Sequence, residues 1–118
     1  MFALQGYNQL QLALGEKMVL LTREKLRLSA SAARSMGLVH SADKIEAVAN
    51  QFGRFLGKPM ADVSEIKSGL KGVRSFVGLE LNEKLQLNSI GQNLESRNMA
   101  HERADQIRAE LARIHEQL

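Results

Sequence analysis

The sequence contains no cysteine, and this absence removes several functions at once. Disulfides, thiolate nucleophiles, iron–sulfur clusters and cysteine-based zinc sites are all excluded, and so is a small secreted scaffold held by disulfides. A reducing compartment fits such a chain, and we expect a cytoplasmic protein. Long apolar runs are missing too, because none exceeds four residues, whereas a helix that spans a bilayer needs about 20. The first fifteen residues lack the basic leader of a signal peptide, so we expect neither secretion by a cleaved leader nor membrane insertion.

Residues that favour strands are scarce, and proline is nearly absent. Valine, isoleucine and threonine together number twelve, whereas leucine alone occurs eighteen times, so the composition favours helices. The single proline, Pro59, is the one hard break, and glycine supplies the other boundaries. We therefore predict a single all-α domain over 1–118, a helical hairpin or open bundle of two long helices with two short helices between them. The helices are expected at about 7–36, 42–56, 62–77 and 82–118.

Apolar residues recur at helical spacing in each predicted helix. The apolar stripe of the first helix includes Leu14, Met18, Leu21, Leu28 and Ala32. Gly37 is expected to end this helix and Ser41 to begin the next. Gly69 and Gly72 weaken the third helix by about 1 kcal/mol each relative to alanine, unless close packing requires them. The rival pattern is an alternation typical of a small sheet, formed by Leu10, Leu12 and Leu14, by Leu79 and Leu81, and by Leu85 and Leu87.

Residues that carry chemistry are few. His101 and His115 are separated by about 21 Å along one helix, so they cannot share a metal ion there. His40, Asp43 and Glu46 are spaced by threes, and a capped helix start with solvated acids explains them better than a metal site does. Glycine-rich phosphate loops and a Gly-x-Ser-x-Gly turn are absent from the sequence. We expect no enzyme, no cofactor and no metal, and we expect exposed surface ion pairs at Glu80 with Lys84, Asp105 with Arg108, and Glu110 with Arg113.

Nucleic-acid binding is the alternative function. The chain has a net charge of +3, and residues 1–60 hold eight basic and four acidic residues, so an anionic partner is conceivable for the first half. A second basic feature lies on the third helix, where Lys67, Lys71 and Arg74 share one face away from the apolar seam. The segments 42–56 and 62–77 have the outline of a helix-turn-helix, with Arg54 and Lys58 near its turn. The third helix lacks base-reading side chains at its first turn, and solvated faces explain the basic stripe more simply.

The length of the first and last predicted helices favours a protein partner. Two short middle helices cannot cover both apolar stripes along their whole length, and an uncovered stripe requires another subunit or another protein. The candidate interface is the stripe on the last helix, which comprises Ala100, Ala104, Ile107, Leu111, Ile114 and Leu118. We therefore expect a non-enzymatic assembly, adaptor or chaperone-like component that self-associates or docks on a helical partner. Small, cysteine-free helical chains of this kind occur among bacterial secretion components and phage structural proteins.

Overall fold

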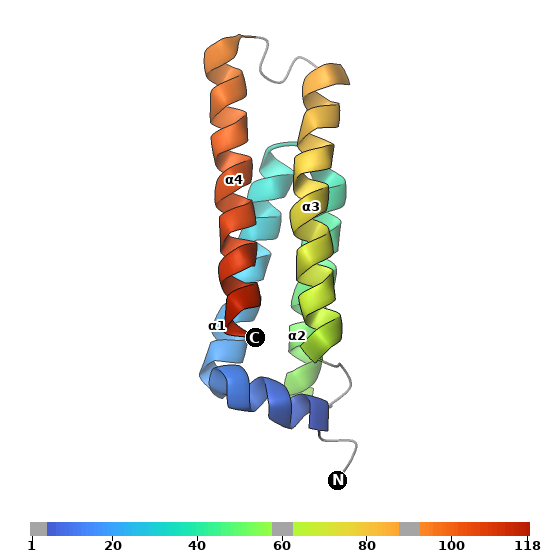
Figure 1. The fold of residues 1–118 in the computed structure, drawn as a ribbon, viewed down its shortest axis with the longest axis vertical. Coiled ribbons are helices and arrows are strands. Elements are labelled where there is room, and N and C mark those ends of the chain that lie inside the picture. Colours follow the sequence, from blue (N-terminus) through green and yellow to red (C-terminus); the bar gives the residue numbers. More distant parts are fainter. Residues whose placement is uncertain (1–4, 58–62, 88–92) are drawn as a thin grey trace.

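The computed structural model describes residues 5–57, 63–87 and 93–118, and these form four helices and no strand. The helices are α1 (Gln5–Ser35), α2 (Val39–Gly57), α3 (Val63–Leu87) and α4 (Leu94–Gln117). They run side by side in an elongated bundle with principal extents of 56 × 19 × 18 Å (Figure 1). The all-α class predicted from the composition is confirmed. The leucines that alternate in the sequence lie on α1 and α3 and not in a sheet.

The turn between α1 and α2 is built around Gly37, as its position in the sequence predicts. Gly37 has a φ of 82°, a left-handed conformation that costs glycine little. The N–H of Leu38 donates to Ala33 O at 2.9 Å, and the N–H of Gly37 donates to Arg34 O at 3.0 Å. This pair of bonds is a Schellman motif, which satisfies carbonyls that the last turn of a helix leaves free. The chain therefore reverses sharply and lays α2 beside α1.

A kink divides α1 into two parts at Gly15, where φ is 72° and ψ is 163°. The short part before the kink runs across the end of the bundle, and the longer part runs along the bundle axis (Figure 1). The sequence predicted one continuous helix over this region. That prediction was incomplete, because a residue with a positive φ cannot continue a right-handed helix, so the chain changes direction at Gly15.

One cluster of buried apolar side chains joins the four helices. Its largest fully buried members include Phe52 of α2, Ile66 and Leu70 of α3, and Leu111 of α4. Fully burying one leucine or isoleucine contributes about 1.5–3 kcal/mol, so this shared cluster is the main force that holds the bundle together. Burial between helices, rather than any local preference, fixes which face of each helix points inward.

The second half of the chain divides differently from the prediction. Residues 82–87 belong to α3, which continues to Leu87, whereas the prediction ended this helix at 77. The last helix begins at Leu94 and not at 82, and Asn93 caps it by accepting the N–H of Ser96 at 2.8 Å. As a result α3 has 25 residues and α4 has 24, so the two helices match in length and cover each other.

Candidate functional site: the groove between α1 and α4

The predicted protein interface on the last helix lies in the core of the bundle. Five residues of this stripe are buried, namely Ala100, Ala104, Ile107, Leu111 and Ile114, and Leu118 is partly buried against them. The expectation of an uncovered stripe on α4 is therefore corrected. Its premise was a short third helix, and the observed α3 is long enough to cover this stripe together with α1.

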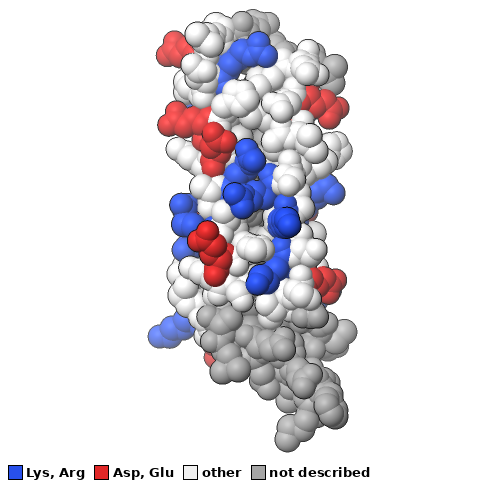
Figure 2. Space-filling view, viewed as in Figure 1, with Lys and Arg blue, Asp and Glu red and all other residues white. Residues whose placement is uncertain are grey.

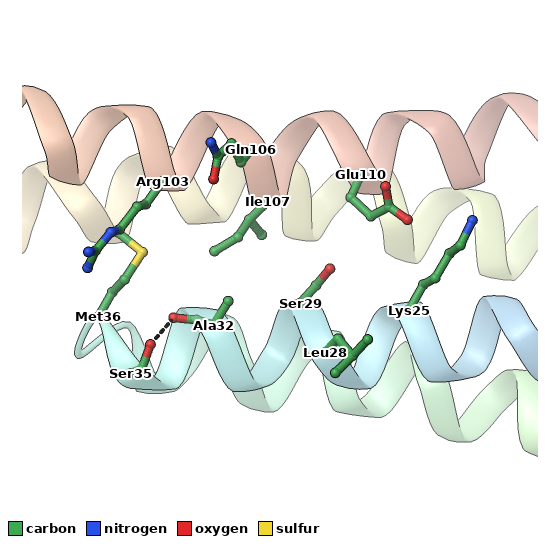
Figure 3. A pocket seen from close by; sticks show the side chains of 10 residues that line it. All are labelled: Lys25, Leu28, Ser29, Ala32, Ser35, Met36, Arg103, Gln106, Ile107 and Glu110. Carbon is green, nitrogen blue, oxygen red and sulfur yellow. Dashed lines mark hydrogen bonds between the residues drawn. The ribbon is translucent and has the colours of Figure 1, made fainter.

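An open groove lies instead between α1 and α4, with a volume of about 570 Å³. Its lining on α4 is Arg103, Gln106, Ile107 and Glu110, and its lining on the α1 side is Lys25, Leu28, Ser29, Ala32, Ser35 and Met36. Figure 3 shows Ile107 pointing from α4 toward α1, where Ser29 and Ala32 are too small to fill the space. Small side chains facing long polar ones leave this hollow along the bundle.

The groove is bordered by leucine side chains that water reaches. Leu28 is 62% exposed and lines the groove, and Leu21, two turns earlier on α1, is 47% exposed. Both belong to the apolar stripe that the sequence predicts on the first helix. The stripe that is buried beyond the kink lies on a neighbouring face and contains Val19, Leu26, Ala30 and Ala33. Of the predicted interface residues, Ile107 does line this groove, at its floor.

Charges of both signs stand on the rim of the groove. Lys25 and Glu110 lie at one end, and Arg103 lies at the other with Met36 (Figure 3). Glu110 accepts two hydrogen bonds from Arg113, at 2.6 and 3.0 Å, which confirms one predicted surface pair. Lys25 and Arg103 have no ion-pair partner among the residues that the structure describes. Lys25 and Arg103 are therefore two rim cations that an acidic group from a binding partner can neutralise.

The predicted nucleic-acid residues are only partly brought together. Lys67, Lys71 and Arg74 do lie on one face of α3, where Lys71 and Arg74 are exposed and Lys67 is half-buried. Arg54 is exposed on α2, and Lys58 lies outside the described residues. Helices α2 and α3 run side by side along the bundle (Figure 1), whereas the helices of a helix-turn-helix cross at a large angle. The helix-turn-helix outline is therefore not what the structure has.

A further arginine from α4 extends the basic face of α3. A Cβ added at Gly78 would lie 3.8 Å from Arg108 Cζ, so the guanidinium rests against α3 one turn beyond Arg74. Arg108 Nε is buried and has no hydrogen-bond partner within the described part of the chain. Asp105 lies 3.6 Å from Arg108, which confirms another predicted surface pair. In Figure 2 basic side chains gather along the middle of the face that α3 and α4 form.

Glu80 is not the surface residue that its spacing from Lys84 predicts. It is 3% exposed and accepts the backbone N–H groups of Ser41 at 2.8 Å and His40 at 3.1 Å. These are the second and third residues of α2, whose own capping position is the apolar Leu38. A carboxylate from α3 therefore caps α2, because free N–H groups at a helix start need an acceptor. Burial raises the pKa of Glu80, but hydrogen bonds from Ser41 and His40 outweigh it and lower the pKa below that of a free glutamate.

The acidic residues near the start of α2 are held by an arginine. Arg34 donates to Asp43 at 2.8 Å and to Glu46 at 3.0 Å, so both carboxylates have a cationic partner. This arrangement explains Asp43 and Glu46 without a metal ion. Ser41, predicted to cap α2, lies instead inside the helix and is buried.

In the described ranges no three histidine or acidic side chains are grouped to hold a metal ion, and no helix is long and apolar enough to cross a membrane.

Comparison with known proteins gave no family model that matches the chain, and no significant match to a curated protein or a solved structure.

Proposed function

We propose that this protein is a non-enzymatic interaction component that associates with a second copy of itself through the groove between α1 and α4. The observation that carries the proposal is Leu28, which borders the groove and also projects from it with 62% of its surface exposed. A symmetric dimer places the same surface on both subunits, so that surface has to offer both a projection and a recess. The groove and Leu28 together meet this requirement.

The rim charges support the same arrangement. An isologous interface faces itself, and a rim of one sign would repel its own copy. This rim holds the cations Lys25 and Arg103 and also Glu110, which Arg113 of the same subunit already contacts, so an antiparallel copy can place each Glu110 between Arg113 and a cation of the partner. The predicted role as an assembly or adaptor component in the cytoplasm is kept as part of this proposal, with the contact moved from the α4 stripe to the groove.

The size of the effect can be estimated from Leu28. Complete burial of a leucine is worth about 1.5–3 kcal/mol, and about 60% of that remains to be gained here, so two copies contribute roughly 2–4 kcal/mol. Because every 1.4 kcal/mol is tenfold in affinity, loss of both leucines raises the dissociation constant at least about 30-fold. Leu28→Glu adds the cost of burying an unpaired charge.

Sedimentation and light scattering at tens of micromolar test the proposal. The wild-type chain is expected to be a dimer and Leu28→Glu a monomer with unchanged helical circular dichroism. The matched control is Leu79→Glu, because Leu79 is equally exposed, at 66%, but lies on α3 away from the groove. It should remain a dimer. A monomeric wild-type protein, or dissociation by both variants alike, contradicts the proposal.

A further inference from the structure

We propose that the face shared by α3 and α4 binds the phosphate backbone of duplex nucleic acid. The site is the basic strip, defined as Lys67, Lys71 and Arg74 of α3 with Arg108 of α4. This is a different surface from the groove, because α4 presents Arg103, Gln106 and Glu110 toward α1 and Arg108 toward α3. The inference is therefore independent of the proposed self-association.

The strip has the geometry of a backbone contact. From Lys67 to the level of Gly78, where Arg108 rests, is eleven residues of helix, or about 16 Å at 1.5 Å per residue. Duplex DNA carries one negative charge about every 1.7 Å of its axis when both strands are counted, so a strip of this length lies along a row of several phosphates. Four cations in a straight line match such a row better than they match a single compact anion.

The electrostatic setting strengthens the strip. Between Glu65 and Glu83 the acidic side chain on α3 is Glu80, and it is buried against the start of α2. The exposed part of α3 over this stretch therefore carries positive charge alone. On α4 the opposing charge is Asp105, 3.6 Å from Arg108, and its side chain is 71% exposed to solvent that screens it.

The residues around the strip favour nucleic acid over a membrane. Ser68, Gly72 and Ser75 are exposed on the neighbouring face of α3, and nothing lies within 4 Å of a Cβ built on Gly72. Small side chains let a backbone approach closely, and serine hydroxyls donate to phosphate oxygens. Binding in a lipid interface needs a continuous apolar face beside the basic one, and among the described residues of α3 the large exposed apolar side chain is Leu79 by itself, one turn beyond Ser75.

The same residues favour a duplex over a single strand. Binding of single strands relies on aromatic side chains on which bases stack. The aromatic residue of α3 is Phe76, which is half-buried and lies under Lys44, with 4.9 Å from Lys44 Nζ to the ring centroid. The strip therefore contacts phosphates and reads no bases, and the expected binding is independent of sequence.

Fluorescence anisotropy with a labelled mixed-sequence DNA duplex tests the site. Four phosphate contacts predict a slope of about −3.6 for the logarithm of affinity against that of salt, or roughly a hundredfold loss between about 50 and 200 mM. The triple variant Lys67→Glu, Lys71→Glu and Arg74→Glu should bind at least about tenfold more weakly. The control variant makes the same change of net charge at exposed positions of α1 and α2, with Lys17→Glu, Arg27→Glu and Arg54→Glu. Its affinity for the duplex should stay within about threefold of that of the wild type.

A gain of affinity distinguishes the strip from general charge. Asp105→Asn removes the acid beside Arg108 and should tighten binding about two- to threefold, whereas Glu102→Gln, exposed on another face of α4, should not. Circular dichroism confirms that each variant is folded. Equal losses in the two triple variants, a salt-independent affinity, or binding to anionic phosphatidylserine vesicles without binding to the duplex overturns the proposal.

Discussion

Glu80 offers the sharpest test of how this bundle is held together, because one buried carboxylate links α3 to the start of α2. Removing it in Glu80→Ala leaves the N–H groups of His40 and Ser41 without their acceptor. A hydrogen bond to a charged group is worth about 1.5–3 kcal/mol, so the loss of two should cost at least about 3 kcal/mol. That is a large part of the roughly 5–15 kcal/mol that stabilises a domain. Urea denaturation followed by circular dichroism measures it.

The amide variant separates the charge from the shape. Glu80→Gln keeps one carbonyl oxygen as an acceptor, but it loses the charge that favours the positive end of α2, so a smaller cost of about 1–2 kcal/mol is expected. The control is Glu83→Gln, three residues later on α3, where the side chain is exposed. It should change the free energy of unfolding by less than about 0.5 kcal/mol.

The pH dependence follows from the lowered pKa of Glu80. Because the folded pKa lies below the unfolded one, the unfolded chain binds more protons, and stability from this group is complete above the ordinary glutamate pKa. It is lost as the pH falls through the folded pKa. The difference in unfolding free energy between wild type and Glu80→Gln should therefore be constant at neutral pH and shrink below about pH 4.5. A difference that is zero at pH 7, or that does not change in acid, refutes the capping argument.

The remaining predictions concern glycines on helices and at their ends. Gly72→Ala should raise the free energy of unfolding by about 0.5–1 kcal/mol, because the space around this glycine is open. Gly69→Ala should raise it less or lower it, because the added Cβ would lie 3.2 Å from Val48 Cγ2. Equal gains for the two variants in urea denaturation contradict this reasoning. Gly37→Ala should cost about 1 kcal/mol, since φ is 82° there, and an unchanged thermal midpoint argues against the strained turn.

The sequence predicts the helices well where local chemistry marks their ends. Gly37 is recognised as the end of α1 because a left-handed residue after a helix is usually glycine. The boundary between α3 and α4 was missed, although Asn93 is a favourable capping residue and Glu95 follows it in the first turn, because the prediction relied on apolar spacing and on the absence of proline. Spacing does not reveal where a helix stops when apolar residues continue on both sides of the break.

The choice of face on α1 could not be made from the sequence. Leu21 and Leu28 have the helical spacing of a core stripe, and so do Leu26, Ala30 and Ala33. The second set is the buried one. Its alanines let a neighbouring helix approach closely, but the sequence does not say which helix that is, and Gly15 breaks the phase that links Leu14 to Leu21. The groove depends on this choice and therefore could not be predicted from the sequence. The contact of Glu80 with His40, forty positions away, could not be predicted either.

Charge counted along the chain does not locate the proposed basic strip. Residues 1–60 have the basic excess, whereas residues 61–118 hold eight basic and nine acidic side chains and a formal charge of −1. The fold changes this balance locally, because Glu80 is buried as a cap and Glu110 is paired with Arg113 on the far side of α4. In the first half, Arg34 is held by Asp43 and Glu46. The field at a surface depends on which charges remain exposed and unpaired, so a half with no positive excess can carry the strip that attracts an anion.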